Sequence, residues 1–265
     1  MTSQLEYRVQ ACNTARESEN KIHDDAVAKR FGFSGGLVPG VDVYAYMVHA
    51  PVAFWGRAWL ERGFAECRFL SPVYDGDEAV VLSDETADGL GLRVESGARN
   101  CAIGVTSLPR DVPAADDFDL PTLPDQRPPA DEATLAVGRL LGMRPLELTP
   151  DYAAQYLTGI RETDPLYANE GLAHPGLVLR TCNWALSHNV VLGPWMHVGS
   201  TVRNLGLAHV GDELSVRARV TANYERKGHR FVELDALVLA DDRSVARVTH
   251  VAIYRPRQML EAADA

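Results

Sequence analysis

The amino-terminal region alternates briefly between apolar and polar residues and then becomes strongly polar. The rough alternation over Leu5–Cys12 predicts a strand. A polar cluster follows, and either Asp24 or Asp25 can cap a short helix over 26–32, which ends at a glycine. The stretch Ser18–Gly40 therefore places side chains capable of proton transfer beside glycines whose backbone N–H groups can approach a ligand closely.

A long apolar segment, Gly40–Gly56, follows the glycine-rich turn. Its apolar residues fall on nearly all sides of a helical projection, which is the pattern of a buried helix. From Gly63 to Pro109 the chain changes to short β-rich runs separated by turn sequences such as DGD, ADGLG and SGARN. A buried helix followed by an antiparallel meander predicts the α+β class.

Residues 109–145 have a different composition. Eight of the fifteen prolines lie between Pro109 and Pro150, mixed with aspartate and alanine. Proline at this density is incompatible with a continuous helix or a central strand, so we expect an extended linker with one short helix over about 131–141. The linker separates an amino-terminal domain, 1–108, from a carboxy-terminal domain, 146–265.

The second half of the chain repeats the first. RFLSPVYDGDEAVV, which begins at Arg68, aligns without gaps to RNLGLAHVGDELSV, which begins at Arg203, at an offset of 135 residues (203 − 68). Both segments contain Gly-Asp-Glu, at 76–78 and at 211–213. The alignment indicates a duplicated unit.

A second match supports the duplication. Pro39-Gly40 corresponds to Pro175-Gly176 at an offset of 136 residues (175 − 39), and an apolar helix is expected after each pair. The second of these helices is predicted over Gly176–Gly193. The chain is therefore expected to contain two copies of a strand, turn, helix and meander unit.

Composition and charge narrow the classes of function. The chain of 265 residues is 46% hydrophobic and 23% charged, which is typical of a globular protein. The net charge is −10 and no lysine- or arginine-rich run is present, so we expect no nucleic-acid partner. The amino terminus lacks a basic segment followed by an apolar one, and no apolar run reaches membrane-spanning length, so we expect a cytoplasmic protein without membrane contact.

Cysteine and histidine spacing gives no sign of a metal site. The four cysteines are far apart, and the eight histidines form neither an HExxH motif nor a paired Cys/His spacing. We expect free thiols, no metal and no bound cofactor.

The residues around the glycine-rich turn resemble a known family. Asn20-Lys21-Ile22-His23-x-Asp25, the turn glycine Gly40, Pro72-Val73 and the Gly-Asp-Glu at 76–78 are similar to the signature of MaoC-like dehydratases and (R)-specific enoyl-CoA hydratases. That signature is D-x-N-P-x-H, followed by a His-Gly turn and a downstream P-V-x-x-G-D. The resemblance covers both halves and implies a tandem, or double, hotdog fold, in which each half wraps an antiparallel sheet around a long buried helix.

The resemblance also implies roles for residues of the first half. His23 and Asn20 match the family histidine and asparagine, and Gly40, with Val41 after it, matches the glycine turn that binds the oxyanion of the substrate. Ser18 stands at the position of the catalytic aspartate, and a serine hydroxyl is too weakly acidic to replace a carboxylate unaided. Whether Glu17, Glu19 or Glu162 supplies the missing carboxylate is left open by the sequence.

The second half matches the same signature in a complementary way. Glu162, Asp164 and Tyr167 occupy the positions of the family aspartate, asparagine and histidine, and Gly176 that of the turn glycine. This half keeps a carboxylate and lacks the histidine, whereas the first half has the histidine and lacks the carboxylate. A structural role for Glu162 and Tyr167 is an equally good interpretation.

The leading hypothesis is therefore a hydro-lyase that acts on an acyl thioester of coenzyme A or of a carrier-protein phosphopantetheine, with His23, Asn20 and Ser18 in the site. A cyclase or isomerase that uses the same pocket, and a non-catalytic acyl-binding protein, are the alternatives. Fused hotdog units imply a pseudo-dimer within one chain. The sequence leaves open a further homodimer, an acyl carrier protein as partner, and the identity of the acyl group.

Overall fold

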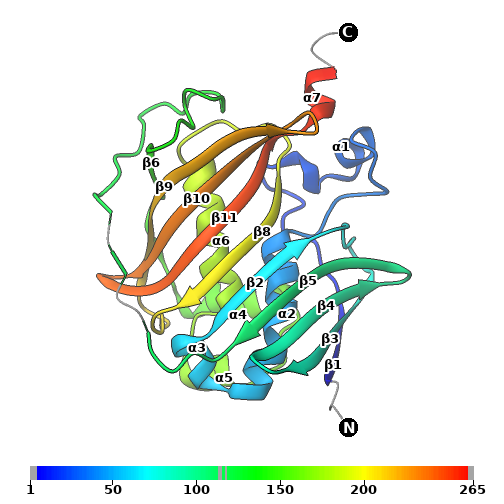
Figure 1. The fold of residues 1–265 in the computed structure, drawn as a ribbon, viewed down its shortest axis with the longest axis vertical. Coiled ribbons are helices and arrows are strands. Elements are labelled where there is room, and N and C mark those ends of the chain that lie inside the picture. Colours follow the sequence, from blue (N-terminus) through cyan, green and yellow to red (C-terminus); the bar gives the residue numbers. More distant parts are fainter. Residues whose placement is uncertain (1–4, 113–114, 117, 262–265) are drawn as a thin grey trace.

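The computed structural model describes residues 5–112, 115–116 and 118–261 of the chain. One antiparallel sheet curves around two long helices, which lie on the same face of the sheet (Figure 1). The first half contributes β1 (Leu5–Gln10), the one-turn helix η1 (Lys21–His23), α1 (Asp25–Arg30), α2 (Gly40–Trp55), α3 (Arg57–Arg62), β2 (Phe64–Phe69), β3 (Glu78–Thr86), β4 (Gly89–Ser96) and β5 (Arg99–Ser107).

The second half repeats this order. It contributes β6 (Leu140–Gly142), β7 (Leu146–Glu147), α4 (Pro150–Gly159), α5 (Leu166–Glu170), α6 (Pro175–Ser187), β8 (Met196–Asn204), β9 (Glu213–Arg226), β10 (His229–Ala240), β11 (Arg243–Arg255) and α7 (Arg257–Glu261). Among the described helices, none is both long and apolar enough to cross a membrane.

The sheet joins the two halves edge to edge. Its strand order is β1-β3-β4-β5-β2-β8-β11-β10-β9-β6, and β7 pairs with β9 beside this path. The halves meet where β2 pairs with β8, from Phe64 opposite Arg203 to Arg68 opposite Gly199. The order on the two sides of this junction is nearly a mirror image, which is the arrangement expected for two copies of one unit.

The duplicated sequence occupies equivalent places in the two halves. The Gly-Asp-Glu segments are turns, and β3 and β9 begin at the glutamate of each. The aspartate of each turn binds the first residue of the third strand that follows it, β5 in the first half and β11 in the second. Arg99 Nη2 lies 2.5 Å from Asp77 Oδ2, and Arg243 Nη2 lies 2.6 Å from Asp212 Oδ2. The tandem α+β double hotdog predicted from the sequence is confirmed.

One of the two central helices is shorter than predicted. The helix α2 matches the predicted apolar segment closely and continues past Pro51, whereas α6 ends at Ser187, six residues before Gly193. Asn189 explains the early end, because its side-chain amide donates to the carbonyls of Ala185 and Gly142. The predicted helix over 176–193 was therefore too long.

The proline-rich segment runs along the second half. The helix predicted over 131–141 is absent: the segment forms turns, in which the Asp131 carboxylate accepts from the N–H groups of Ala133 and Thr134, and then enters the sheet as β6. The local aspartate bonds compete with a helix, and Gly138 adopts a positive φ of 88°. The domain limits at 108 and 146 remain a prediction.

A buried ion pair connects the central helices of the two halves. Asp42 near the start of α2 is fully buried and binds the guanidinium group of Arg180 from α6. Burial lowers the pKa of Arg180, but the nearby Asp42 carboxylate outweighs this effect and raises it, so the arginine stays charged. The pair lies next to the cavity described below.

Candidate active site

The polar segment before the glycine-rich turn folds through two side-chain caps. The Asn20 side chain accepts a hydrogen bond from Ile22 N–H at the start of η1, and the Asp24 side chain accepts one from Val27 N–H at the start of α1. These caps satisfy N–H groups that a helix start leaves unpaired. They hold His23 at the end of η1, with its ring facing the loop before α2.

The hydrogen bonds of His23 determine its tautomer. His23 Nδ1 lies 2.7 Å from the carbonyl oxygen of Leu37, which can only accept, so Nδ1 carries the hydrogen and Nε2 has the lone pair, which faces the Asn20 Nδ2 donor at 3.4 Å. Burial lowers the pKa of His23 below its ordinary value. At neutral pH the ring is therefore uncharged and can accept a proton at Nε2.

Asn20 connects the first half to the second. Its Oδ1 accepts from Trp195 N–H at 3.2 Å, and its Nδ2 donates to the Trp195 carbonyl at 3.0 Å. The same Nδ2 lies 3.4 Å from His23 Nε2. Because both ends of the amide are occupied, Asn20 positions the chain around His23 and is not free to activate a ligand.

His23 lies where the two arms of a cavity meet. The apolar arm has a volume of about 410 Å³ and is lined by aromatic and aliphatic side chains, including Phe31, Phe33, Val43, Phe69 and Val73. The polar arm has a volume of about 330 Å³ and is lined by Thr14, Ser18, Glu19, Arg127, Arg180 and His188, among others. Both arms are lined by Asn20, His23, Pro39, Asn183 and Trp195, which form the junction between them.

The first turn of α2 contributes backbone donors to this cavity. Within the described part of the chain, neither the Gly40 N–H nor the Val41 N–H has a hydrogen-bond acceptor, and Pro39 provides no side-chain cap. Gly40 lines the apolar arm and Val41 the polar arm. Free N–H groups at a helix start favour an oxygen that carries negative charge.

The missing carboxylate is not supplied by the residues considered from sequence. Ser18 Oγ donates to the Asn20 carbonyl at 3.3 Å, and Glu17 is exposed. Glu19 forms a two-point ion pair with Arg127, at 3.0 Å and 2.9 Å. In the described structure, no carboxylate is bonded to the His23 ring, whose polar neighbours are the Leu37 carbonyl and Asn20.

Glu162 lies at a separate, closed cluster in the second half. Its Oε1 lies 2.8 Å from His49 Nδ1 and accepts from the N–H groups of Thr163 and Asp164, and its Oε2 lies 3.3 Å from His174 Nε2. Burial alone would raise the pKa of Glu162, but the hydrogen bonds with His174 and His49 hold it well below the ordinary value. The carboxylate is thus charged and fully partnered.

The second glycine turn is closed in the same cluster. The Gly176 N–H donates to His174 Nδ1 at 3.0 Å, so the donor equivalent to the free Gly40 N–H is already used. A Cβ at Gly176 would lie 2.5 Å from Tyr156 Oη and 2.6 Å from Ala45 Cβ, which leaves no room for a ligand. Tyr167 is buried against the His174 ring with a hydroxyl that has no partner among the described residues, and Asp164 accepts from Leu166 N–H.

Asn183 and Arg180 line the cavity although sequence reasoning did not select them. Both project from α6 of the second half, and Asn183 Oδ1 is buried without a hydrogen-bond partner among the described residues. Their signal in the sequence was a charged and an amide residue inside the otherwise apolar run GLVLRTCNWAL. A polar residue in a helix that is expected to be buried is a candidate site residue, because an unpaired polar group is costly in a buried place.

No group of three or more histidine, cysteine or acidic residues in the described structure could hold a metal ion. The cysteines of the described residues are all free thiols, as predicted.

Comparisons with known proteins identify the fold. No protein-family model matches the chain, and no curated protein matches it by sequence. A structure from Chloroflexus aurantiacus J-10-fl, described as a MaoC domain protein dehydratase, is similar over 97% of this chain and 96% of that one, with a TM-score of 0.64 and 12% identity.

Two further structures are similar over nearly the whole chain. A conserved Mycobacterium tuberculosis protein with a double hotdog fold matches over 95% of this chain and 96% of its own, with a TM-score of 0.62 and 15% identity. A protein of Thermobifida fusca YX described as a thioesterase II matches over 95% and 92%, with a TM-score of 0.56 and 14% identity. At these identities the similarity concerns the fold, and the chain is a double hotdog protein.

Proposed function

We propose that this protein is an acyl-thioester hydratase or dehydratase that uses His23 as a single acid–base group. The observation that carries the proposal is the position of His23: an uncharged ring at the junction of a two-armed cavity, whose unprotonated Nε2 has only a long contact of 3.4 Å with Asn20 Nδ2, beside two unpartnered N–H groups of α2. The similarity in fold to a protein described as a dehydratase supports it.

The proposed reaction needs one proton acceptor and one oxyanion site. In hydration, His23 Nε2 takes a proton from water while the water oxygen bonds to the β-carbon of an enoyl thioester. The electron pair of the double bond moves toward the thioester carbonyl, whose oxygen becomes an enolate held by the Gly40 and Val41 N–H groups. The protonated His23 then returns the proton to the α-carbon, and dehydration follows the reverse course.

Other residues of the junction position the reactants. Asn20 holds the η1 turn against Trp195 from the second half. Asn183, whose carbonyl oxygen has no partner among the described residues, is available to accept a hydrogen bond from the reacting water. Ser18 lines the polar arm and takes no part in proton transfer.

An isomerase is the second candidate, because a single base without a carboxylate partner is sufficient to move a proton along an enoyl thioester. His23 would remove a proton from the γ-carbon, the electron pair would pass to the thioester carbonyl to give a dienolate held by the same two N–H groups, and the protonated His23 would return the proton to the α-carbon, which leaves the double bond between the β- and γ-carbons. The position of the double bond in the product, followed by NMR, separates this reaction from hydration.

The test is a panel of enoyl and 3-hydroxyacyl thioesters with wild-type protein, His23→Gln and the control His209→Gln, which changes a half-exposed histidine at a distant turn. We expect His23→Gln to lower kcat/KM by roughly 10²- to 10⁴-fold, since it removes the acid–base group. The control should retain wild-type activity. An inactive wild-type protein, or a fully active His23→Gln variant, contradicts the proposal.

A further inference from the structure

The carboxy-terminal helix α7 forms part of the wall of the apolar arm. Arg257 and Gln258 of this helix line the apolar arm and not the polar arm, so α7 borders the cavity outside the junction at His23. Phe31, at the end of α1, and His229, at the start of β10, line the same arm. Figure 1 shows α7 and α1 at the same end of the molecule. Elements of both halves thus meet α7 at this wall.

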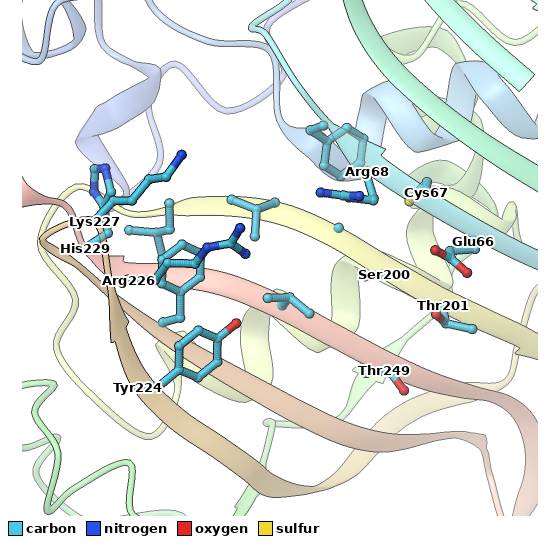
Figure 2. Close-up of a pocket in the computed structure, with 16 residues that line it drawn as sticks. Glu66, Cys67, Arg68, Ser200, Thr201, Tyr224, Arg226, Lys227, His229 and Thr249 are labelled. Carbon is cyan, nitrogen blue, oxygen red and sulfur yellow. The ribbon is translucent and has the colours of Figure 1, made fainter.

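Three contacts hold α7 in this position. Gln258 Nε2 donates to the Phe31 carbonyl at 3.3 Å, which connects α7 to the first half. The Arg257 N–H donates to His229 Nδ1 at 3.1 Å, which connects α7 to the second half. Figure 2 shows His229 at the β9–β10 hairpin. Met259 packs against the loop that precedes β8. The helix is therefore docked across the arm by contacts on three sides.

The side chain of Gln258 is polar in a part of the cavity that is otherwise largely apolar. Phe31, Phe33 and Ile253 line the same arm. Gln258 Oε1 is buried and has no hydrogen-bond partner among the described residues. A buried amide oxygen without a partner costs stability, so an apolar residue would suit the packing of α7 better at this position. This cost indicates that Gln258 has a role in the cavity.

We propose that Gln258 on α7 limits the length of the acyl chain that the apolar arm accepts. The chain extends from the thioester at His23 along the aromatic and aliphatic side chains of the arm, and its terminal methyl group stops at the Gln258 side chain. The inference rests on the proposed function, which places an acyl thioester at His23. It defines the substrate class as thioesters of apolar acyl chains with an upper limit of length that α7 determines.

The first experiment measures binding without catalysis. Isothermal titration calorimetry uses saturated N-acetylcysteamine thioesters with butanoyl, octanoyl, dodecanoyl and hexadecanoyl chains, which have neither a double bond nor a hydroxyl group for the proposed reaction. With the wild-type protein, affinity should increase by roughly three- to fourfold for each methylene group that becomes buried. The increase should stop at the chain length that reaches Gln258, and longer chains should bind no more tightly.

The second experiment repeats the titrations with two substitutions that should move this limit in opposite directions. Gln258→Ala removes the side chain at the wall, so the limit should lengthen and the hexadecanoyl thioester should bind about tenfold more tightly. Gln258→Trp fills the same space, so the limit should shorten and the longer chains should bind about tenfold more weakly. Neither variant should change binding of the butanoyl thioester. The matched control is Gln155→Ala, at an exposed glutamine of α4, which should leave the whole series unchanged.

The pair of variants separates a limit of chain length from a loss of structure, because loosening of α7 would shift both variants in the same direction. Three results overturn the proposal: no binding by the wild type, affinity that increases through the whole series, or equal shifts in Gln258→Ala and Gln258→Trp. A wild-type protein that shows the limit and its two opposite shifts but converts no enoyl or 3-hydroxyacyl thioester contradicts the proposed function and supports α7 as the end of an acyl-binding cavity.

Discussion

The two glycine turns of this protein occupy equivalent places but differ in what their backbone donors contact. In the first half, Gly40 N–H is free and borders a cavity that also contains the uncharged His23. In the second half, Gly176 N–H is bonded to His174, whose other nitrogen faces the buried Glu162 carboxylate. One turn is open toward a ligand, whereas the protein's own side chains close the other.

This difference indicates that the two copies of the duplicated unit have different roles, one in stability and the other in ligand binding. In the second half the motif carboxylate, Glu162, contacts His174 of the glycine turn and accepts from the N–H groups of Thr163 and Asp164. In the first half the ring of His23 contacts no carboxylate among the described residues, and its Nε2, with a long contact to Asn20 Nδ2, borders the cavity. We therefore expect changes in the second cluster to affect stability and changes at His23 to affect activity.

The largest stability effect is expected from Glu162→Ala. The substitution leaves two N–H groups and two histidines without their acceptor, and breaking a buried pair of this kind costs about 3–5 kcal/mol of unfolding free energy. Urea unfolding measures the loss. Glu61→Ala, which removes an exposed pair with Arg57, is the control and should cost less than about 1 kcal/mol. If Glu162→Ala is as stable as the wild type but has lost activity, the assignment of roles to the two halves is wrong.

A methyl group added to each turn glycine should have unequal effects. At Gly176 the new Cβ would lie 2.5 Å from Tyr156 Oη and 2.6 Å from Ala45 Cβ, so Gly176→Ala should cost about 2–3 kcal/mol of stability. At Gly40 the nearest atoms, His197 Nδ1 and Phe69 Cε2, would lie at 3.1 Å, so Gly40→Ala should cost about 1 kcal/mol. Thermal unfolding of both variants decides the order, and a more stable Gly176→Ala would contradict the closed packing.

Acid should destabilise the protein chiefly through histidines of the second half. Burial lowers the pKa of His250 to about 3, and it lowers the pKa values of His197 and His174 as well. Between the ordinary histidine pKa of about 6.5 and pH 3, the unfolded chain binds a proton at His250 that the folded chain does not. The uncharged buried histidines therefore make their full contribution to the free energy of unfolding above about pH 6.5. Below this pH the free energy of unfolding falls, by roughly 1.4 kcal/mol per pH unit for each such histidine.

Urea unfolding between pH 7.5 and 4.5 measures this slope. His250→Asn should reduce it by about one proton, whatever its effect on stability at pH 7.5. The wild-type protein, unfolded under the same conditions, gives the reference slope. A slope that is the same in His250→Asn and in the wild type would show that His250 is already protonated in the folded protein.

Much of the fold could be read from local pattern and from the internal repeat. The apolar run over Gly40–Gly56 fills a helix that ends one residue earlier, at Trp55, and the Gly-Asp-Glu turns precede β3 and β9 as the alignment suggested. Capping by Asp24 was also visible in the sequence. The predicted helices over 131–141 and 176–193 were wrong in whole or in part, because aspartate and asparagine side chains bonded to the backbone there.

The sequence by itself determined the fold class, the duplication and the residues around the first glycine turn, because these depend on periodicity, turn chemistry and short spacings along the chain. Tertiary structure alone decided which groups meet. Asn20 bonds to Trp195, Arg180 reaches Asp42, and Glu162 joins His49 and His174 at a distance from His23 in the fold. These contacts join residues more than a hundred positions apart, except for that of Glu162 with His174, and they follow from how the two halves pack. The stretch from Ser18 to Val41 thus contains the histidine and the unpartnered N–H groups, and residues of the second half, among them Asn183 and Trp195, complete the cavity around them.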